Sequence, residues 1–120
     1  MSDERRFLKR RKFTYYMRVL DNYTQQAVGY LADISEKGFQ LDSPQQVAVN
    51  KDFSFRLDLT PDISDKNFIT FSARCRWCKP DEKDPFSYDA GFQITGISPH
   101  DNEIFQRIVT KYGSRDEGIW

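Results

Sequence analysis

Long hydrophobic runs are absent from this 120-residue sequence, and residues suited to catalysis are scarce. No apolar segment approaches the roughly 18 residues of a membrane-spanning helix, and the first residues are charged where a signal peptide would be apolar. The chain has one histidine, His100, and no glycine-rich phosphate loop, so no catalytic arrangement is recognisable. We therefore expect one soluble, cytoplasmic domain that is not an enzyme and that holds no metal or cofactor.

Cysteine is also rare, which excludes a secreted disulfide scaffold. Cys75 and Cys78 have the spacing of a C-x-x-C motif. In redox enzymes this motif begins a helix, whereas here it ends a predicted strand, and a zinc site would need about four ligands. In an extended strand the two thiols would face opposite sides, so we interpret both as packing residues, with a redox or metal role as the alternative.

The net charge is zero, but the charges are unevenly distributed along the chain. The 18 Lys+Arg and 18 Asp+Glu exclude a generally basic nucleic-acid coat. Residues 1–12 nevertheless carry a charge of +4, which leaves −4 for residues 13–120. The basic residues of the first segment are Arg5, Arg6, Lys9, Arg10, Arg11 and Lys12. We interpret residues 1–12 as a basic arm and residues 13–120 as one folded body.

The sequence does contain a series of short segments in which apolar and polar residues alternate. These segments cover residues 13–19, 28–32, 53–59, 69–77 and 88–94. A period of two is typical of strands with one buried face, and residues that favour turns separate the segments. The pattern predicts a mainly β fold, a small six-stranded antiparallel barrel whose closure removes exposed strand edges.

Near the C-terminus the period becomes helical. Ser98 and Pro99 are suited to the N-cap and first turn of a helix. An apolar stripe follows, formed by Ile104, Phe105, Ile108, Val109 and Tyr112. We predict a helix over about residues 99–112 that packs its stripe on an open end of the barrel, with His100 exposed in its first turn.

Two short motifs lie in the arm and in the loop after the second predicted strand. Arg6 and Arg10 form R-x-x-x-R, and Asp33, Ser35 and Gly38 form D-x-S-x-x-G. Taken alone, the first motif is compatible with a solvated basic tail, and the second with a turn in which Asp and Ser cap backbone groups. As a binding element, Asp33 accepts from N–H donors, Ser35 donates and accepts, and Gly38 allows positive φ and close backbone approach.

In this order, and about 23 residues apart, the two motifs resemble those of the PilZ domain family, which binds the bacterial second messenger cyclic di-GMP. The resemblance covers nearly the whole chain, including residues 88–94 and the helix that follows. It implies a ligand site formed by the five motif residues, Arg6, Arg10, Asp33, Ser35 and Gly38. Three further candidates are Arg5, Arg11 and Trp77, the last as a stacking platform.

The residue chemistry suits this ligand. Arginine pairs with phosphate through two N–H groups and also bonds guanine O6 and N7, and Asp33 is complementary to the donor edge of guanine. We expect a receptor or adaptor whose arm orders over the nucleotide and changes a surface that a downstream protein reads. Two alternatives are a protein-interaction barrel that does not use the nucleotide and a small barrel that binds single-stranded nucleic acid through aromatics such as Tyr15 and Tyr16. The −4 body disfavours long nucleic acids, and no membrane insertion is expected.

Overall fold

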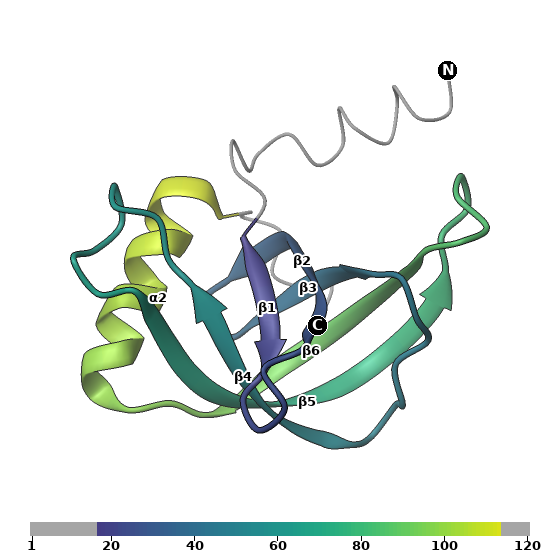
Figure 1. Cartoon of the computed structure of the whole chain (residues 1–120), viewed down its shortest axis with the longest axis horizontal. Helices are drawn as coiled ribbons and strands as arrows, with labels where there is room; N and C mark the ends of the chain where they lie inside the picture. Colours follow the sequence, from purple (N-terminus) through teal and green to yellow (C-terminus); the bar gives the residue numbers. More distant parts are fainter. Residues whose placement is uncertain (1–16, 114–120) are drawn as a thin grey trace.

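Six strands and one helix form within residues 17–113, the part of the chain that the computed structural model describes. The elements are β1 (Arg18–Asp21), β2 (Ala27–Ser35), β3 (Gly38–Ser43), β4 (Asp52–Asp58), β5 (Phe68–Pro80), β6 (Tyr88–Gly96) and α2 (Pro99–Tyr112). The strands close into an antiparallel barrel in the order β1-β2-β3-β6-β5-β4 (Figure 1). The predictions of a mainly β barrel and a C-terminal helix are therefore confirmed. The first predicted strand is described only from Arg18, since residues 13–16 lie outside the described part.

Phenylalanines of β3, β4, β5 and β6 fill much of the barrel interior, because alternate residues of each strand point into it. Phe39 lies at its centre, with its ring centroid 5.1 Å from that of Phe92, 5.5 Å from Phe71 and 6.1 Å from Phe55. Three of these four side chains are fully buried, and Phe71 is 5% exposed. Large rings thus supply a dense core in a small barrel, which explains how a chain with 38% hydrophobic residues buries enough apolar surface.

Helix α2 extends this core at the side of the barrel where it contacts β2 and β5. The Ser98 side chain accepts from the Asp101 N–H at 3.3 Å, and Pro99 occupies the first turn, as the sequence predicts. Ile104, Phe105 and Ile108 are buried, and the Phe105 ring lies 5.9 Å from that of Phe71. The apolar stripe is therefore core.

The start of α2 is also fixed by a contact that the sequence pattern did not reveal. Asp101 is buried and accepts from Lys66 Nζ at 2.6 Å and from the Thr70 N–H at 3.2 Å. Burial raises the pKa of Asp101, but the hydrogen bonds from Lys66 and Thr70 outweigh it and hold this pKa below its ordinary value. The carboxylate thus ties the helix to the loop before β5 and to β5 itself.

A bulge in β5 contradicts two expectations from the sequence. The pairing of β5 with β6 shifts register between Cys75 and Trp77, which offsets the alternation of inner and outer positions. Trp77 therefore does not share the inner face of residues 69–75, and Cys78 packs against the core rather than facing away from the buried Cys75. No disulfide joins the two thiols, and Cys78 Sγ accepts from the Val47 N–H at 3.4 Å. Both cysteines contribute to packing, as interpreted.

No helix among residues 17–113 is both long and apolar enough to cross a membrane.

Candidate ligand-binding site

The D-x-S-x-x-G motif spans the tight turn between β2 and β3. Asp33 pairs across the two strands with Gln40, and Ser35 pairs with Gly38, so the motif residues lie on the outer face while the intervening Ile34 is fully buried. Strict alternation from the buried Leu31 would turn Asp33 inward, but the register of β2 shifts between Leu31 and Asp33. This irregularity places Asp33 on the outer face, next to the inward Ile34. The strand pairing therefore brings Asp33, Ser35 and Gly38 together at one end of the β2–β3 hairpin.

The motif residues differ in how they are held. The Asp33 carboxylate is half-buried and accepts from the Ile34 N–H at 2.8 Å. Ser35 is 2% exposed, and its hydroxyl lies 3.4 Å from the Gly38 carbonyl to which it donates. Gly38 does not have a positive φ, so the left-handed backbone that glycine allows is not used there. If glycine is needed at this position, the reason is that another group approaches its backbone closely.

The turn between Ser35 and Gly38 is held by two neighbouring elements. Gln106 of α2 donates through Nε2 to the Glu36 carbonyl at 3.1 Å. On the other side, the Ile94 N–H of β6 donates to the Lys37 carbonyl at 2.9 Å. Both turn carbonyls are thus fixed by residues more than 50 positions away in the sequence, and the motif is presented by a supported turn.

The outer face carries a row of residues that continues from the motif across the sheet. Asp33 pairs with Gln40, Gln40 with Gly91, and Gly91 with Trp77, which links β2, β3, β6 and β5. Trp77 therefore lies three strands from Asp33, a path of roughly 14 Å along the curved sheet at about 4.8 Å per strand. Gln40 and Gly91 were not singled out from the sequence, because only the strand register shows that they lie between the two predicted site residues.

Trp77 is the aromatic member of this row. A side chain added at Gly91 would place its Cβ 2.3 Å from Trp77 Nε1, so the indole ring lies directly over the glycine backbone. Lys79 Nζ lies 5.5 Å from the ring centroid. The bulge therefore turns Trp77 onto the outer face, on the same row as the D-x-S-x-x-G motif, where a stacking role is sterically possible.

The arginine half of the predicted site lies outside the described residues. This applies to Arg6 and Arg10 of the R-x-x-x-R motif and to the additional candidates Arg5 and Arg11. Their assignment stays a prediction from the sequence.

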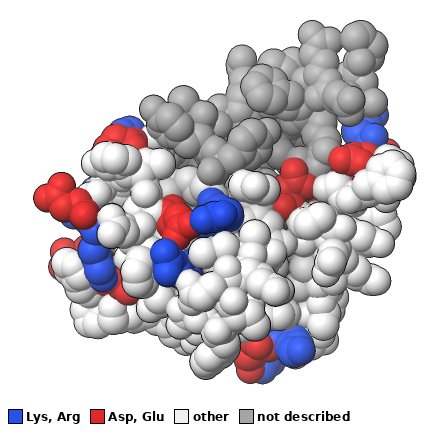
Figure 2. Space-filling view, viewed as in Figure 1, with Lys and Arg blue, Asp and Glu red and all other residues white. Residues whose placement is uncertain are grey.

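Some cations of the described surface are already paired, while Lys37, Arg76 and Lys79 lie in or next to the row. Residues 17–113 contain 14 acidic and 11 basic residues, and the face in Figure 2 shows both signs interspersed. Arg18 pairs with Asp58 at 3.0 Å, and Arg74 forms two bonds with Asp52 at 2.8 and 3.1 Å. The hydrogen bond from Arg74 lowers the pKa of Asp52. Because residues 17–113 carry a net charge of −3, a dianionic ligand on this surface would gain from further cations elsewhere in the chain.

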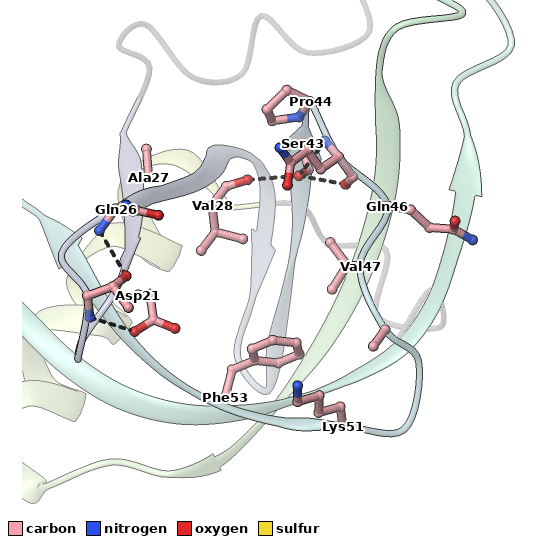
Figure 3. Close-up of a pocket in the computed structure, with 13 residues that line it drawn as sticks. Asp21, Gln26, Ala27, Val28, Ser43, Pro44, Gln46, Val47, Lys51 and Phe53 are labelled. Atoms are coloured by element: carbon pink, nitrogen blue, oxygen red, sulfur yellow. Dashed lines mark hydrogen bonds between the residues drawn. The ribbon is translucent and has the colours of Figure 1, made fainter.

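A separate hollow lies between the β1–β2 hairpin and the connection from β3 to β4 (Figure 3). Its volume is about 500 Å³, and Phe53, Val28 and Val47 form its apolar wall. Its charged lining consists of Lys51 and Asp21, which cancel each other. None of the described candidates Asp33, Ser35, Gly38 and Trp77 lines it, so the hollow and the D-x-S-x-x-G motif are different features.

The remaining reactive side chains give no sign of catalysis in the described part. Burial, together with the nearby Cys78, raises the pKa of Cys75 to about 11, which keeps this thiol protonated and weakly nucleophilic at neutral pH. His100 is exposed in the first turn of α2, as predicted. Among residues 17–113 no three His, Cys, Asp or Glu side chains are grouped to hold a metal ion.

Comparisons with known proteins agree with this architecture. The sequence profile of the PilZ domain matches residues 4–111. Among solved structures, the chain is similar to the Bacillus subtilis inhibitor of motility MotI/DgrA, with a TM-score of 0.61, 13% identity and coverage of 79% of this chain and 45% of that one. It is also similar to the PilZ domain with c-di-GMP of YcgR from Escherichia coli, with a TM-score of 0.59, 15% identity and coverage of 81% and 80%.

At these identities the structural similarities concern the fold, and the chain spans about half the length of the MotI/DgrA chain. A search of curated protein sequences gave no significant match. The profile match covers most of the chain, including both motif regions, and the barrel with its C-terminal helix agrees with it. The chain therefore belongs to the PilZ domain family.

Proposed function

We propose that the chain is a receptor for cyclic di-GMP that acts as an adaptor without chemistry of its own. The observation that carries the proposal is the placement of Asp33, Ser35 and Gly38 at one supported turn on the outer face of a PilZ barrel. The similarity to the YcgR PilZ domain solved with c-di-GMP supports the choice of ligand.

In the proposal, the arm adds cations to those that the described surface offers. In the proposal, Arg6 and Arg10 pair with the phosphates and guanine edges of the nucleotide, and Arg5 and Arg11 contribute additional charge. Ordering the arm costs about 1–2 kcal/mol for each residue fixed. Several charge-assisted hydrogen bonds of about 1.5–3 kcal/mol each offset this cost, so the arm orders on the ligand and not before it.

The barrel supplies the groups that recognise the base. The Asp33 carboxylate accepts from guanine N1–H and N2–H₂, Ser35 adds a hydrogen bond, and Gly38 lets the ligand approach the backbone. A second guanine stacks on Trp77, at the other end of the outer-face row.

The adaptor role requires a protein partner whose identity is open. The solved neighbour MotI/DgrA is described as an inhibitor of motility, and a comparable action on a protein machine is compatible with a small binding domain. In the proposal, the ordered arm and the nucleotide together present a surface that the partner distinguishes from the ligand-free one.

Isothermal titration calorimetry of the whole chain with cyclic di-GMP tests the proposal. We expect a dissociation constant between submicromolar and low micromolar values, that is, a binding free energy of about −7 to −9 kcal/mol. Arg10→Ala should weaken binding by about tenfold or more. Lys9→Ala is the matched control, since it removes an arm charge outside the motif and should change affinity by less than about threefold.

Two results would contradict the proposal. One is the absence of heat and of competition at tens of micromolar protein, and the other is equal binding by Arg10→Ala and the parent chain. Single-stranded oligonucleotides serve as the competing ligand class. If their affinity rises with length, falls steeply with salt and exceeds that of cyclic di-GMP, the chain is a nucleic-acid-binding barrel instead.

A further inference from the structure

The connection between β5 and β6 presents one phenylalanine to solvent. Phe86 is 84% exposed, whereas the phenylalanines of the core are almost completely buried. The connection comprises residues 81–87 and is here termed the β5–β6 tip. Figure 1 shows it projecting beyond the barrel, on the opposite side of the molecule from α2. Removing an exposed phenylalanine from water is favourable, so Phe86 offers apolar surface for binding that residues 17–113 leave uncovered.

The β5–β6 tip is held in one conformation by its own hydrogen bonds. The Asp81 carboxylate accepts from the N–H groups of Lys83 and Asp84 at 2.8 and 3.2 Å. The Asp84 carboxylate accepts from the Phe86 N–H at 3.0 Å, and the Asp81 N–H donates to the Ser87 carbonyl at 2.9 Å. Phe86 is therefore displayed by an ordered loop, and little backbone entropy is lost when a partner covers it.

The surroundings of Phe86 define the chemistry of that partner. Three carboxylates and one ammonium group lie in the tip, those of Asp81, Glu82, Asp84 and Lys83. Asp81 is buried, which leaves Glu82 and Asp84 against Lys83 near the ring, a net charge of −1. An aromatic anchor with an acidic rim is complementary to an apolar pocket bordered by Lys or Arg. A second copy of the same tip would repel it.

We propose that the β5–β6 tip is a docking point for a protein partner, with Phe86 inserted into an apolar pocket that has a basic rim. The tip is joined to the candidate ligand site through the two strands that carry Trp77 and Gly91. It is also fixed to β3, because the Ser87 hydroxyl donates to the Asp42 carboxylate. This inference rests on the proposed function only in assuming that the chain is an adaptor with a protein partner. Cyclic di-GMP is expected to change the affinity of the chain for that partner.

Site-specific photocrosslinking locates the contact even though the partner is unidentified. A benzophenone amino acid is placed at position 86 of the full chain in its native cells, and in parallel at position 23. Tyr23 is the matched control, because it is 83% exposed on a different hairpin. We expect a defined adduct with one protein from position 86 and none from position 23.

The crosslinked protein is then purified and its affinity measured against variants. Phe86→Ser should weaken the complex by about tenfold or more, while Tyr23→Ser should stay within about twofold of the parent. Phe86→Ser should keep an unchanged amide spectrum and an unchanged affinity for cyclic di-GMP, which separates this inference from the proposed function. The inference is overturned if position 86 gives no adduct or only an adduct with another copy of the chain, or if Phe86→Ser binds the partner like the parent.

Discussion

The inner and outer faces of β2, β3, β6 and β5 are built from the same strands in alternation, yet they are specified in different ways. On the inner face Phe39 and Phe92 are fully buried and stack on each other, so each position is defined by apolar packing. On the outer face Asp33, Gln40 and Trp77 are partly exposed, and they are brought together only by strand register. The inner face determines whether the barrel folds, whereas we expect the outer face to determine what it binds.

The strongest test of this contrast compares adjacent residues on the two faces. Phe39→Ala should lower the free energy of unfolding by about 3–5 kcal/mol, because it opens a cavity between three aromatic rings. Gln40→Ala should change it by less than about 0.5 kcal/mol, since this side chain lies on the outer face. Urea denaturation followed by circular dichroism measures both free energies of unfolding. Similar decreases for the two variants would contradict the distinction between the inner and outer faces.

A second test should affect binding more than folding. Asp33→Ala should weaken cyclic di-GMP binding by roughly 10- to 100-fold, because it removes charge-assisted bonds of about 1.5–3 kcal/mol to the base. Asp33→Asn keeps an oxygen that can accept from the Ile34 N–H, so it controls for local structure. Calorimetry gives the affinities. If Asp33→Ala binds cyclic di-GMP like the parent, this carboxylate does not contact the ligand.

A third test concerns the contact between Trp77 and Gly91, where the outer face is most tightly packed. Gly91→Ala should displace the indole ring, since the added Cβ would lie 2.3 Å from Nε1, at a cost of about 1–3 kcal/mol in stability. If the Trp77 ring is a stacking platform, the affinity for cyclic di-GMP should fall as well. Indole fluorescence and calorimetry report the two effects, and Gly96→Ala, which meets only ordinary contacts at 3.8 Å, is the control.

The smallest expected effect is the pH dependence of the helix contact. The pKa of Asp101 is lowered in the folded state, so its contribution to stability is present above its ordinary value of 3.8 and is lost as the pH falls through the lower folded value. The Tm of the parent should therefore decrease more between pH 5 and pH 3 than that of Asp101→Asn. Parallel decreases would mean that the contact with Lys66 contributes nothing.

Much of the inner face could be predicted from the sequence. The period of two in residues 53–59 predicts the buried Phe55 and Leu57, and the helical period after Ser98 predicts the buried stripe of α2. These predictions succeed because burial acts on every second residue of a strand and on one face of a helix. Both signals are local, so they do not depend on which strands pair.

The outer face could be predicted only in part. The D-x-S-x-x-G residues were found as a motif, but the positions of Gln40 and Gly91 depend on pairing between strands far apart in the sequence. The bulge at Cys75–Trp77 shifts the alternation by one residue, and no local pattern signals it. For the same reason, the contact of Gln106 with the Glu36 carbonyl could not be inferred before the helix was placed.

The central claim is that cyclic di-GMP binds on the outer face and not in the hollow near Phe53. An amide chemical-shift titration of the whole chain with the nucleotide tests it most directly. We predict large shifts at Asp33, Ser35 and Gly38 and at the Trp77 indole, and small shifts at Val28, Val47 and Phe53, which line the hollow. The absence of shifts, or shifts concentrated at the hollow, would contradict the account.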